Sequence, residues 1–424
     1  MTEPTAPLHR LADQVAAARH GRTTVVELID AALERVDATR DIHAWVTMSE
    51  HALSDAAERD ERAERGALHG VALGVKDIID VAGLPTRCGS AVTPPEPVGT
   101  SAACVRRLEQ LGAVVLGKTV TTEFAYFAPG PTRNPHNLEH TPGGSSSGSA
   151  AAVAAGVVPL ALGSQTAGSL TRPAAYCGVA GLVLAHGSVD MAGIAGLSPS
   201  LDSLGLLTPG VQDLAYAYQA FTGDHLDEAA RPSVLVWRGT ELADIDPQMV
   251  TALECAAGLL AEAGLEVREL DWSDHVETLA ADHVTIMAYE AVREAPDLYE
   301  QHRAELSAPL VELLASGLAI SDEDYRAAIV RRDRSREDLQ DVLGAGAVVL
   351  GPAAPGPAPR GLGATGSPIL SRPWQALGLV ALTVPGARTS TGLPLGLQVI
   401  GLPGHESGVF AAARSLESRL AGDR

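Results

Sequence analysis

The sequence has few aromatic residues. Phe, Trp and Tyr together make up 4% of its 424 residues, although 46% of the residues are hydrophobic. Ala, Val, Leu and Gly must therefore build the core, and a core of small residues favours close packing of helices on a sheet. Large α/β enzymes often reach this length as one unit, so the length does not require several domains.

Cysteine is also scarce. The four cysteines, Cys88, Cys104, Cys177 and Cys255, show no metal-ligand spacing. A chain of this size has no need of disulfide bonds to hold a core together. We therefore expect reduced, mostly buried thiols and no bound metal, and nothing around any of the four marks a catalytic nucleophile.

Basic residues are outnumbered by acidic ones. Lys and Arg total 31 and Asp and Glu total 52, which gives a formal net charge of −21. An acidic surface repels nucleic-acid phosphates and anionic lipid headgroups. The charge argues against a nucleic-acid partner, but it does not exclude an anionic small substrate, because one buried arginine can dominate a local site.

Long hydrophobic runs are missing. The longest apolar stretch, residues 150–163, is too short to span a bilayer and contains Pro159. Residues Met1 to Pro7 lack the basic-then-apolar pattern of a secretory signal. We expect a cytoplasmic protein that does not bind a membrane.

Helical and extended patterns alternate along the chain. Amphipathic spacing and capping residues predict helices at residues 8–19, 24–36, 51–65, 101–111, 149–155, 246–264 and 406–421, with mostly helical structure over 275–343. Short apolar runs predict strands at 71–75, 113–116, 157–162, 233–237, 347–350, 380–384 and 395–400. This alternation predicts an α/β fold with a large mixed, mostly parallel twisted sheet that is covered by helices on both faces.

No break in composition divides the chain, so we expect a single domain over residues 1–424. The Pro/Gly-rich segment 351–366 is the clearest loop. It is either a mobile rim or a plain surface connection.

The most unusual stretch is Thr141 to Ala150, which reads TPGGSSSGSA and leads into a predicted helix. Such a stretch can be a flexible linker, or a phosphate site at a helix N-terminus, although the Gly-Lys-Ser/Thr of a P-loop is absent. It can also be catalytic. Glycines let the backbone approach a reacting centre, and serine hydroxyls can relay a proton.

A second glycine-containing loop, Gly163 to Ser169, follows a predicted strand. Thr166, Ala167 and Gly168 precede Ser169, and consecutive amide N–H groups in a tight turn can form an oxyanion hole. This loop offers a serine nucleophile beside the donors that its reaction would need.

Lys76 follows the predicted strand 71–75 and precedes Asp77. Burial at the end of a strand disfavours the charged ammonium, lowers its pKa and turns lysine into a base. Alternatively, Lys76 forms an ion pair with Asp77 or with a distant carboxylate at the edge of the sheet. The position alone leaves both interpretations open.

Taken together, these motifs resemble the amidase signature family. Residues 74–77, the serine-rich block 141–150, the loop 163–169, residues 173–181 and the late segment 392–398 run in that family's order and spacing. The resemblance covers about residues 10–420 and implies the amidase signature fold. It is most specific around residues 70–80 and 141–181.

The resemblance also implies a division of labour along the chain. Residues 1–65 would form N-terminal helices and residues 70–215 the catalytic core. Residues 220–345 would form a variable, mostly helical region on the substrate side, and residues 346–424 would return to the core sheet.

Position by position, Ser169 resembles the nucleophile, Ser145 a bridging serine that follows a cis peptide bond, and Lys76 the terminal base. The resemblance implies a Ser–Ser–Lys triad that hydrolyses a carboxamide through an acyl-serine intermediate. The backbone N–H groups of Thr166, Ala167, Gly168 and Ser169 would form the oxyanion hole. No cofactor or metal is implied.

Arg172 is the third residue after Ser169, an arrangement similar to malonamidase-type members, in which arginine binds a carboxylate of the substrate. The implied substrate is a small amide such as malonamate. Alternatively, Arg172 pairs with a carboxylate of the protein or caps a loop. Gly143, Gly144 and Tyr126 are the other residues that we expect at the substrate.

Three features depart from the family's common pattern. Residues 181–186 lack the lysine that the family often carries after its Gly-Leu. Ala167 stands where a glycine is usual, which would be unfavourable if this position needed a positive φ. Gln165 stands where many members carry Asp, and we expect its amide to hydrogen-bond the serine loop all the same.

Three other functions remain alternatives. The chain also resembles the catalytic component of a glutamyl-tRNA amidotransferase, although a net charge of −21 argues against a surface for tRNA. A non-catalytic binding member of the family and, more distantly, a nucleotide-binding protein are the others. Family members often dimerise, so the resemblance also implies a homodimer.

Overall fold

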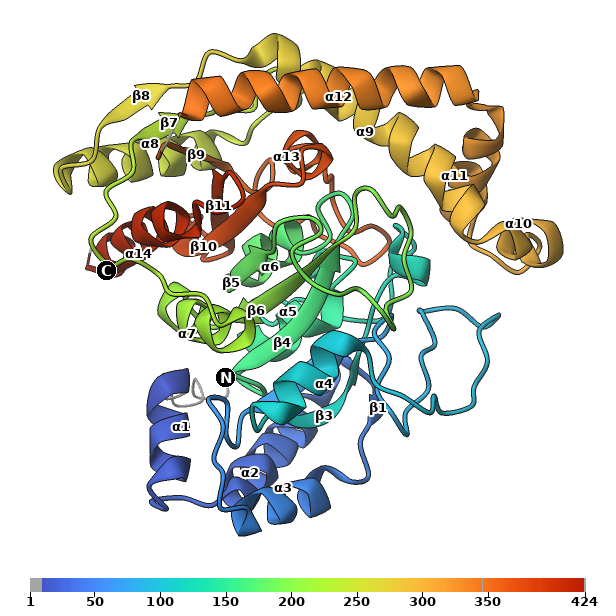
Figure 1. The fold of residues 1–424 in the computed structure, drawn as a ribbon, viewed down its shortest axis with the longest axis vertical. Coiled ribbons are helices and arrows are strands. Elements are labelled where there is room, and N and C mark those ends of the chain that lie inside the picture. The colour runs from blue at the N-terminus through green and yellow to red at the C-terminus, as the bar shows by residue number, and fades with distance from the viewer. Residues whose placement is uncertain (1–9, 345, 423–424) are drawn as a thin grey trace.

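The computed structural model describes residues 10–344 and 346–422, and one twisted sheet runs through them (Figure 1). The strand order is β1-β3-β2-β4-β6-β5-β10-β11-β9-β7-β8. The strands are β1 (Trp45–Met48), β2 (Ala72–Lys76), β3 (Val114–Thr119), β4 (Leu160–Gln165), β5 (Ala180–Val183), β6 (Ser203–Thr208), β7 (Val234–Val236), β8 (Val267–Glu269), β9 (Val348–Pro352), β10 (Val380–Arg388) and β11 (Pro394–Gly401).

The sheet is mixed, as predicted, but it is not mostly parallel. Among the described strands, β2 is parallel to β3 and β4, and β7 is parallel to β8 and β9. The other six pairings are antiparallel. The prediction erred because it missed β5 and β6 in the centre of the sheet, and because β10 and β11 are joined by a loop too short for a parallel crossover.

Two layers of helices enclose the sheet. One hydrophobic cluster packs a face of the sheet against α1 (Leu11–Arg19), α4 (Ala103–Gln110), α7 (Val211–Thr222), α8 (Pro247–Glu262) and α14 (Glu406–Gly422). The other packs the opposite face against α2 (Val25–Ala38), α3 (Ala52–Glu61), α5 (Ser147–Ala154), α6 (Thr171–Cys177) and α13 (Arg372–Ala376). The prediction of helices on both faces is therefore confirmed.

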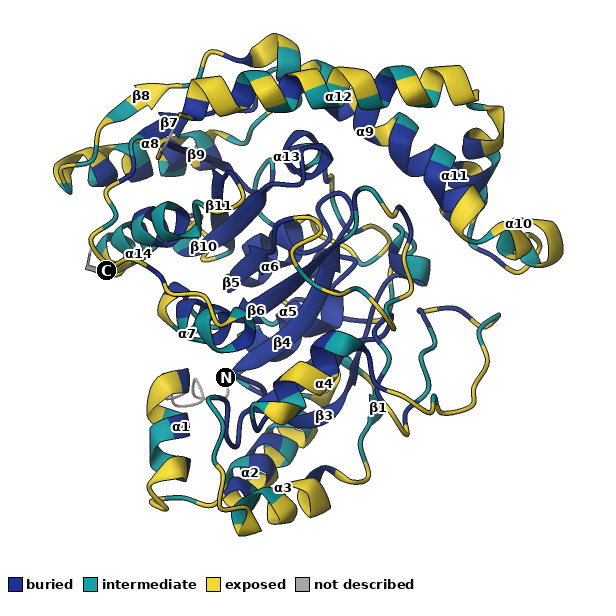
Figure 2. Ribbon diagram, viewed as in Figure 1, coloured by how far each residue is buried: buried dark blue, intermediate teal, exposed yellow. Residues whose placement is uncertain are grey.

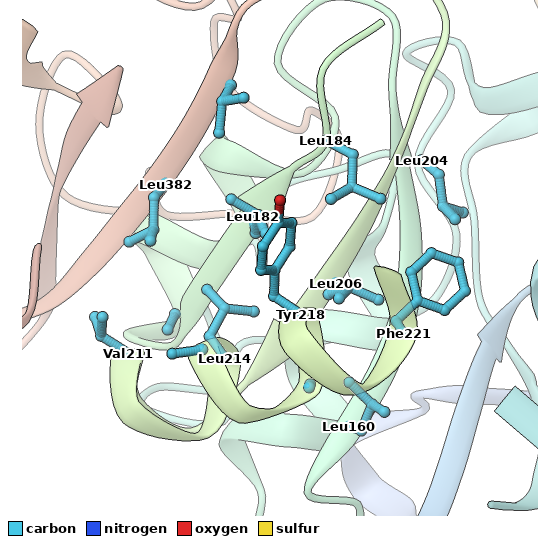
Figure 3. Close-up of a cluster of buried hydrophobic side chains, with 14 of the residues drawn as sticks. Leu160, Leu182, Leu184, Leu204, Leu206, Val211, Leu214, Tyr218, Phe221 and Leu382 are labelled. Carbon is cyan, nitrogen blue, oxygen red and sulfur yellow. The ribbon is translucent and has the colours of Figure 1, made fainter. Parts of the chain in front are cut away.

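Leucines that alternate along the central strands form the first cluster (Figure 3). Leu204 and Leu206 lie two residues apart on β6, so their side chains point to the same face of the sheet. Val211, Leu214 and Tyr218 of α7 cover them, at the three- and four-residue spacing that places side chains on one side of a helix. Buried small and branched residues thus fill the core that the low aromatic content predicts.

A helical subregion extends from the sheet. It contains α9 (Ser273–Glu294), α10 (Pro296–His302), α11 (Ala308–Ala319) and α12 (Asp322–Leu343), and α9, α11 and α12 contribute to a third hydrophobic cluster. Figure 2 shows that α12 leaves much of its surface exposed whereas the central strands are buried. Leu197 and Leu201, from the loop before β6, join this third cluster. Helices α9 and α12 also contribute Val276, Leu279 and Leu339 to the second cluster, so the subregion packs on the core of the sheet.

Several local predictions are confirmed. Thr24 and Glu27 form the predicted capping box of α2, and Asp246 caps α8 with proline at its first position. Strand β4 lies three residues later than predicted, after Pro159. The predicted start of the first helix at Leu8, and the residues before it, lie outside the described residues.

Other predictions concern what the chain binds or spans. Three of the four thiols are buried, and Cys255 is exposed. In the part of the chain that the structure describes, no helix is both long and apolar enough to cross a membrane. Across those same residues, no cluster of three or more His, Cys, Asp or Glu side chains is arranged to hold a metal ion.

Candidate active site

Neighbouring parallel strands bring the two glycine-containing loops of the sequence together. Strand β2 pairs with β4, with Val75 opposite Leu162. Because parallel strands end at the same edge of a sheet, Lys76 at the end of β2 lies beside the loop that follows β4. Helix α5 begins at Ser147, so the serine-rich block reaches this same edge.

Lys76 is completely buried, and its two hydrogen-bond partners are hydroxyl groups. Its Nζ lies 2.6 Å from Ser145 Oγ and 2.8 Å from Ser164 Oγ. Burial lowers the pKa of Lys76 to about 7, although the charge of Asp202 partly opposes this shift. A large fraction of Lys76 is therefore neutral near pH 7, which is the state in which an amine accepts a proton.

Ser145 and Ser169 are brought to the same place. The peptide bond between Gly144 and Ser145 is cis, as the resemblance implies. The amide of Ser146 donates a 3.0 Å hydrogen bond to the carbonyl oxygen of Ser169, which joins the two loops. Both serines are largely buried, with 2% of Ser145 and 7% of Ser169 exposed.

Both serines line one small pocket. Its walls come from six separate segments of the chain and combine apolar with polar side chains. The lining residues are Ala125, Tyr126, Phe127, Ser145, Thr166, Ala167, Ser169, Arg172, Leu197, Met287, Thr365 and Pro368. A small pocket with one charged side chain in its wall, Arg172, suits a compact substrate with one charged group.

The turn from Thr166 to Ser169 leaves its amide groups unused. Among the hydrogen bonds of the described residues, none is donated by a backbone N–H of this turn. Ala167 is not among the residues with positive φ, so alanine brings no left-handed strain at this position. The turn therefore presents free N–H groups beside Ser169, which is what an oxyanion hole requires.

Gln165 holds the start of α6 in place. Its side-chain oxygen accepts hydrogen bonds from the amides of Leu170 and Thr171 and from the Thr171 hydroxyl. Its amide nitrogen donates to Gln375 at 3.0 Å. The glutamine thus supports the serine loop although it replaces the more usual aspartate.

Arg172 is a buried cation without a carboxylate partner. Its guanidinium donates to the carbonyl oxygens of Gly144 and Gly366 and to the hydroxyl of Thr365. No ion pair among the described residues includes it, and its Nε is buried without a hydrogen bond. Burial lowers the pKa of Arg172 to about 10, so the guanidinium remains charged at neutral pH.

The other residues expected at the substrate divide into two groups. Tyr126 lies in the pocket wall, whereas Gly143 and Gly144 are not among the lining residues. Gly143 has φ +83°, and a side chain there would meet Pro173. The two glycines therefore let the serine-rich block pack closely, which the sequence pattern did not distinguish from contact with substrate.

Several site residues were missed. Ser164 contacts Lys76. The one sequence feature that could have pointed to it is a polar residue within an apolar strand. Thr365 lies in the Pro/Gly-rich segment 351–366, which we interpreted as either a mobile rim or a plain surface connection. In the structure, Thr365 is buried beside Arg172. His283 and Met287 come from the distant helix α9, and no local pattern links them to the site.

Known proteins with the same overall structure act on amides. The family model named Amidase matches residues 27–410. The chain is 32% identical to a glutamyl-tRNA(Gln) amidotransferase subunit from Exiguobacterium sibiricum, over 95% of this chain and 96% of the relative. A crystal structure of an amidase superposes with a TM-score of 0.89 at 32% identity, covering 97% of this chain and 100% of that one. The native peptide amidase from Stenotrophomonas maltophilia gives 0.84 at 28% identity, with 98% and 97% covered.

Proposed function

The chain belongs to the amidase family, and we propose that it hydrolyses a small carboxamide with a triad of Ser169, Ser145 and Lys76. Family and fold make it an enzyme that acts on amide C–N bonds, as a hydrolase or an amidotransferase. The roles of individual residues and the choice of substrate are our proposal.

One observation carries the proposal. Lys76 is fully buried, yet its Nζ contacts the hydroxyls of Ser145 and Ser164 and pairs with no carboxylate of the described residues. A lysine that served only structure would be expected to pair with an acid, because an isolated buried charge is costly. A buried amine with a lowered pKa beside a serine is instead suited to general-base catalysis.

Acylation follows from this arrangement. Ser169 Oγ attacks the carbonyl carbon of the amide, and its proton passes through the Ser145 hydroxyl to the neutral Nζ of Lys76. The N–H groups of the turn 166–169 stabilise the negative charge that develops on the carbonyl oxygen. The C–N bond then breaks, and Lys76 returns the proton through Ser145 to the departing nitrogen, which leaves as ammonia or an amine.

Deacylation repeats the same steps with water. Water attacks the ester carbon of acyl-Ser169 and gives its proton through Ser145 to Lys76. The Ser169 oxygen then leaves, and it takes the proton back along the same path. The products are a carboxylic acid and free enzyme, so the cycle consumes one water for each amide.

The substrate class is inferred from Arg172. Arg172 is the one charged residue among those that line the pocket, and its Nε–H has no partner in the described structure. A carboxylate is the ligand that matches a guanidinium best. We propose a short amide that carries a free carboxylate, such as malonamate.

A substrate panel tests this proposal. Malonamate, a neutral aliphatic amide of the same length and an aryl amide would be offered to the enzyme, with Ser169→Ala as the inactive control. We expect release of ammonia to be fastest from malonamate, and Arg172→Met to remove that preference while it leaves turnover of the neutral amide. Equal losses on both amides would refute the role of Arg172 in binding a carboxylate.

The glutamyl-tRNA amidotransferase function is the second candidate, because curated relatives of that name match nearly the whole chain. A chain with this function would hydrolyse glutamine and work with partner proteins. Glutamine hydrolysis that appears only after co-purification with such partners would favour this candidate. Failure of a fluorophosphonate probe to label Ser169 would instead favour a non-catalytic binding member.

A further inference from the structure

Helix α9 presents one side to the pocket although it lies more than a hundred residues after Ser169 in the chain. His283, Met287 and Glu290 follow one another at spacings of four and three residues, so they share a side of the helix. Met287 lines the pocket. Glu290 accepts hydrogen bonds from Ser198 and Ser200, in the loop that contributes Leu197 to the pocket wall.

His283 makes the most direct contact with the proposed catalytic turn. Its side chain is completely buried, and its Nε2 lies 2.7 Å from the carbonyl oxygen of Thr166. A carbonyl oxygen only accepts hydrogen bonds, so Nε2 must carry the proton. The other ring nitrogen, Nδ1, is buried and makes no hydrogen bond within the described structure. Burial lowers the pKa of His283 to about 3, so the ring is neutral at physiological pH.

The carbonyl of Thr166 and the amide N–H of Ala167 belong to the same peptide group. A peptide group is planar, and in the trans form its C=O and N–H point in opposite directions. The bond between these two residues is not among the cis peptides, so a donor that fixes the Thr166 oxygen also fixes the direction of the Ala167 N–H.

A second contact restrains the same residue. The hydroxyl of Thr166 donates to Oδ1 of the half-buried Asp202, whose other oxygen accepts from the amides of Leu197 and Ser198. Thr166 is therefore held through its side chain by Asp202 and through its backbone by His283. The hydroxyl contact restrains the position of the residue, and the contact from His283 restrains the peptide plane.

We propose that His283 is a positioning residue of the oxyanion hole, and that its Nε2–H holds the Thr166–Ala167 peptide so that the Ala167 N–H faces the reacting carbonyl. The inference rests on the proposed function, because it assigns a role in stabilising the oxyanion. With this role of His283, the helical segment after residue 272 takes part in the reaction itself as well as in the choice of substrate.

The test compares replacements that lose or keep the donor. His283→Phe fills the space without a donor, and His283→Gln places an amide N–H near the position of Nε2. Loss of one oxyanion donor costs about 10²–10³-fold in rate, so a misdirected donor is expected to lower kcat by about 10–100-fold while KM changes little. We expect His283→Gln to regain most of that loss. His283→Met is the second donor-free variant if His283→Phe does not fold.

Labelling of Ser169 by a fluorophosphonate provides a readout that needs no knowledge of the substrate. Ser169 Oγ attacks the phosphorus and fluoride leaves, and the phosphoryl oxygen that gains negative charge occupies the same hole. The labelling rate should therefore fall in His283→Phe and recover in His283→Gln. Tyr216→Phe is the control, because it removes a 2.7 Å hydrogen bond from a side chain to the Ala67 carbonyl in another part of the molecule.

The outcomes separate the two proposals. If the wild type is neither labelled nor active on carboxamides, the proposed function fails. If the wild type is labelled and a folded donor-free variant reacts as fast, only the role of His283 is refuted. A loss that His283→Gln fails to restore, or an equal loss in Tyr216→Phe, also overturns that role.

Discussion

Lys76 and Lys118 lie on the neighbouring strands β2 and β3, and both side chains are completely buried. Lys118 is 3.0 Å from Oδ1 of Asp77, with which it forms a buried ion pair. Within the described residues, the Nζ of Lys76 contacts hydroxyl groups and forms no ion pair. Burial lowers the pKa of both lysines, but the adjacent carboxylate opposes this shift at Lys118. The same residue type therefore serves stability on one strand and is available for proton transfer on the other.

The geometry of the strands explains the difference. Asp77 directly follows Lys76, and successive side chains of an extended chain point to opposite faces of the sheet. Lys118 pairs in register with Val75, two residues before Asp77, and so shares the face of Asp77. The sequence neighbour of Lys76 is thus turned away from it and toward the other lysine.

Of the substitutions that distinguish the two lysines, the one at Lys76 should have the largest effect, and this effect should be on kcat. Replacement Lys76→Met removes the proposed base, and a general base typically contributes about 10²–10⁴-fold, so kcat should fall by that factor. The Tm should hold or rise, because a neutral side chain is easier to bury than an amine. Steady-state kinetics and thermal unfolding check both expectations, and a variant that keeps a tenth of its activity would contradict the assignment.

Replacement Lys118→Met should act mainly on stability. It leaves the Asp77 carboxylate buried without its partner, and breaking a buried ion pair costs about 3–5 kcal/mol of unfolding free energy. Urea unfolding measures this loss. The double variant with Asp77→Leu is the control and should recover much of it, and a single variant as stable as the wild type would show that the ion pair is not needed.

The pH dependence of activity should reveal the lowered pKa of Lys76. Protonated lysine cannot accept the serine proton, so kcat/KM should fall as the pH drops through about 7. Below that point the fall should be about tenfold per pH unit. A neutral amide substrate avoids titration of a substrate carboxylate in the same range. A midpoint near that of ordinary carboxylates would assign the base to another residue.

The smallest expected effect concerns Ser164. Its hydroxyl accepts a hydrogen bond from Lys76, which favours the ammonium form. One hydrogen bond is worth about 0.5–1.5 kcal/mol, so Ser164→Ala should lower the midpoint of the acidic limb by about one pH unit or less. The pH profile of kcat/KM measures this shift, and a midpoint that rises would contradict the contact. Thr86→Ala is the matched control, because the Thr86 hydroxyl accepts a 2.9 Å hydrogen bond from the other buried lysine, Lys118.

Much of the fold follows from local patterns. Thr24 and Glu27 form a capping box in the structure because their side chains satisfy each other's backbone N–H groups, an interaction that needs only near neighbours. The central strands β5 and β6 were missed because their short runs depend on pairing with distant partners. Strand direction was mispredicted for the same reason.

The site divides in a similar way. The motif around Ser145 and Ser169 is local enough to be read from the chain, and the structure places both serines in one pocket. His283 acts across more than a hundred residues, and Thr365 belongs to a segment that had the composition of an ordinary loop. The residues next to them in sequence give no indication that either one contacts the site.

The sequence by itself determined the order and spacing of Lys76, Ser145 and Ser169, and with them the family, because the glycines and serines of these loops are close together along the chain. Only the tertiary structure decided which buried lysine lacks a carboxylate, since this depends on strand register and on the alternation of side chains across the sheet. It also decided that Arg172 meets no acid in the described protein, because the groups around a buried charge come from segments far apart in sequence.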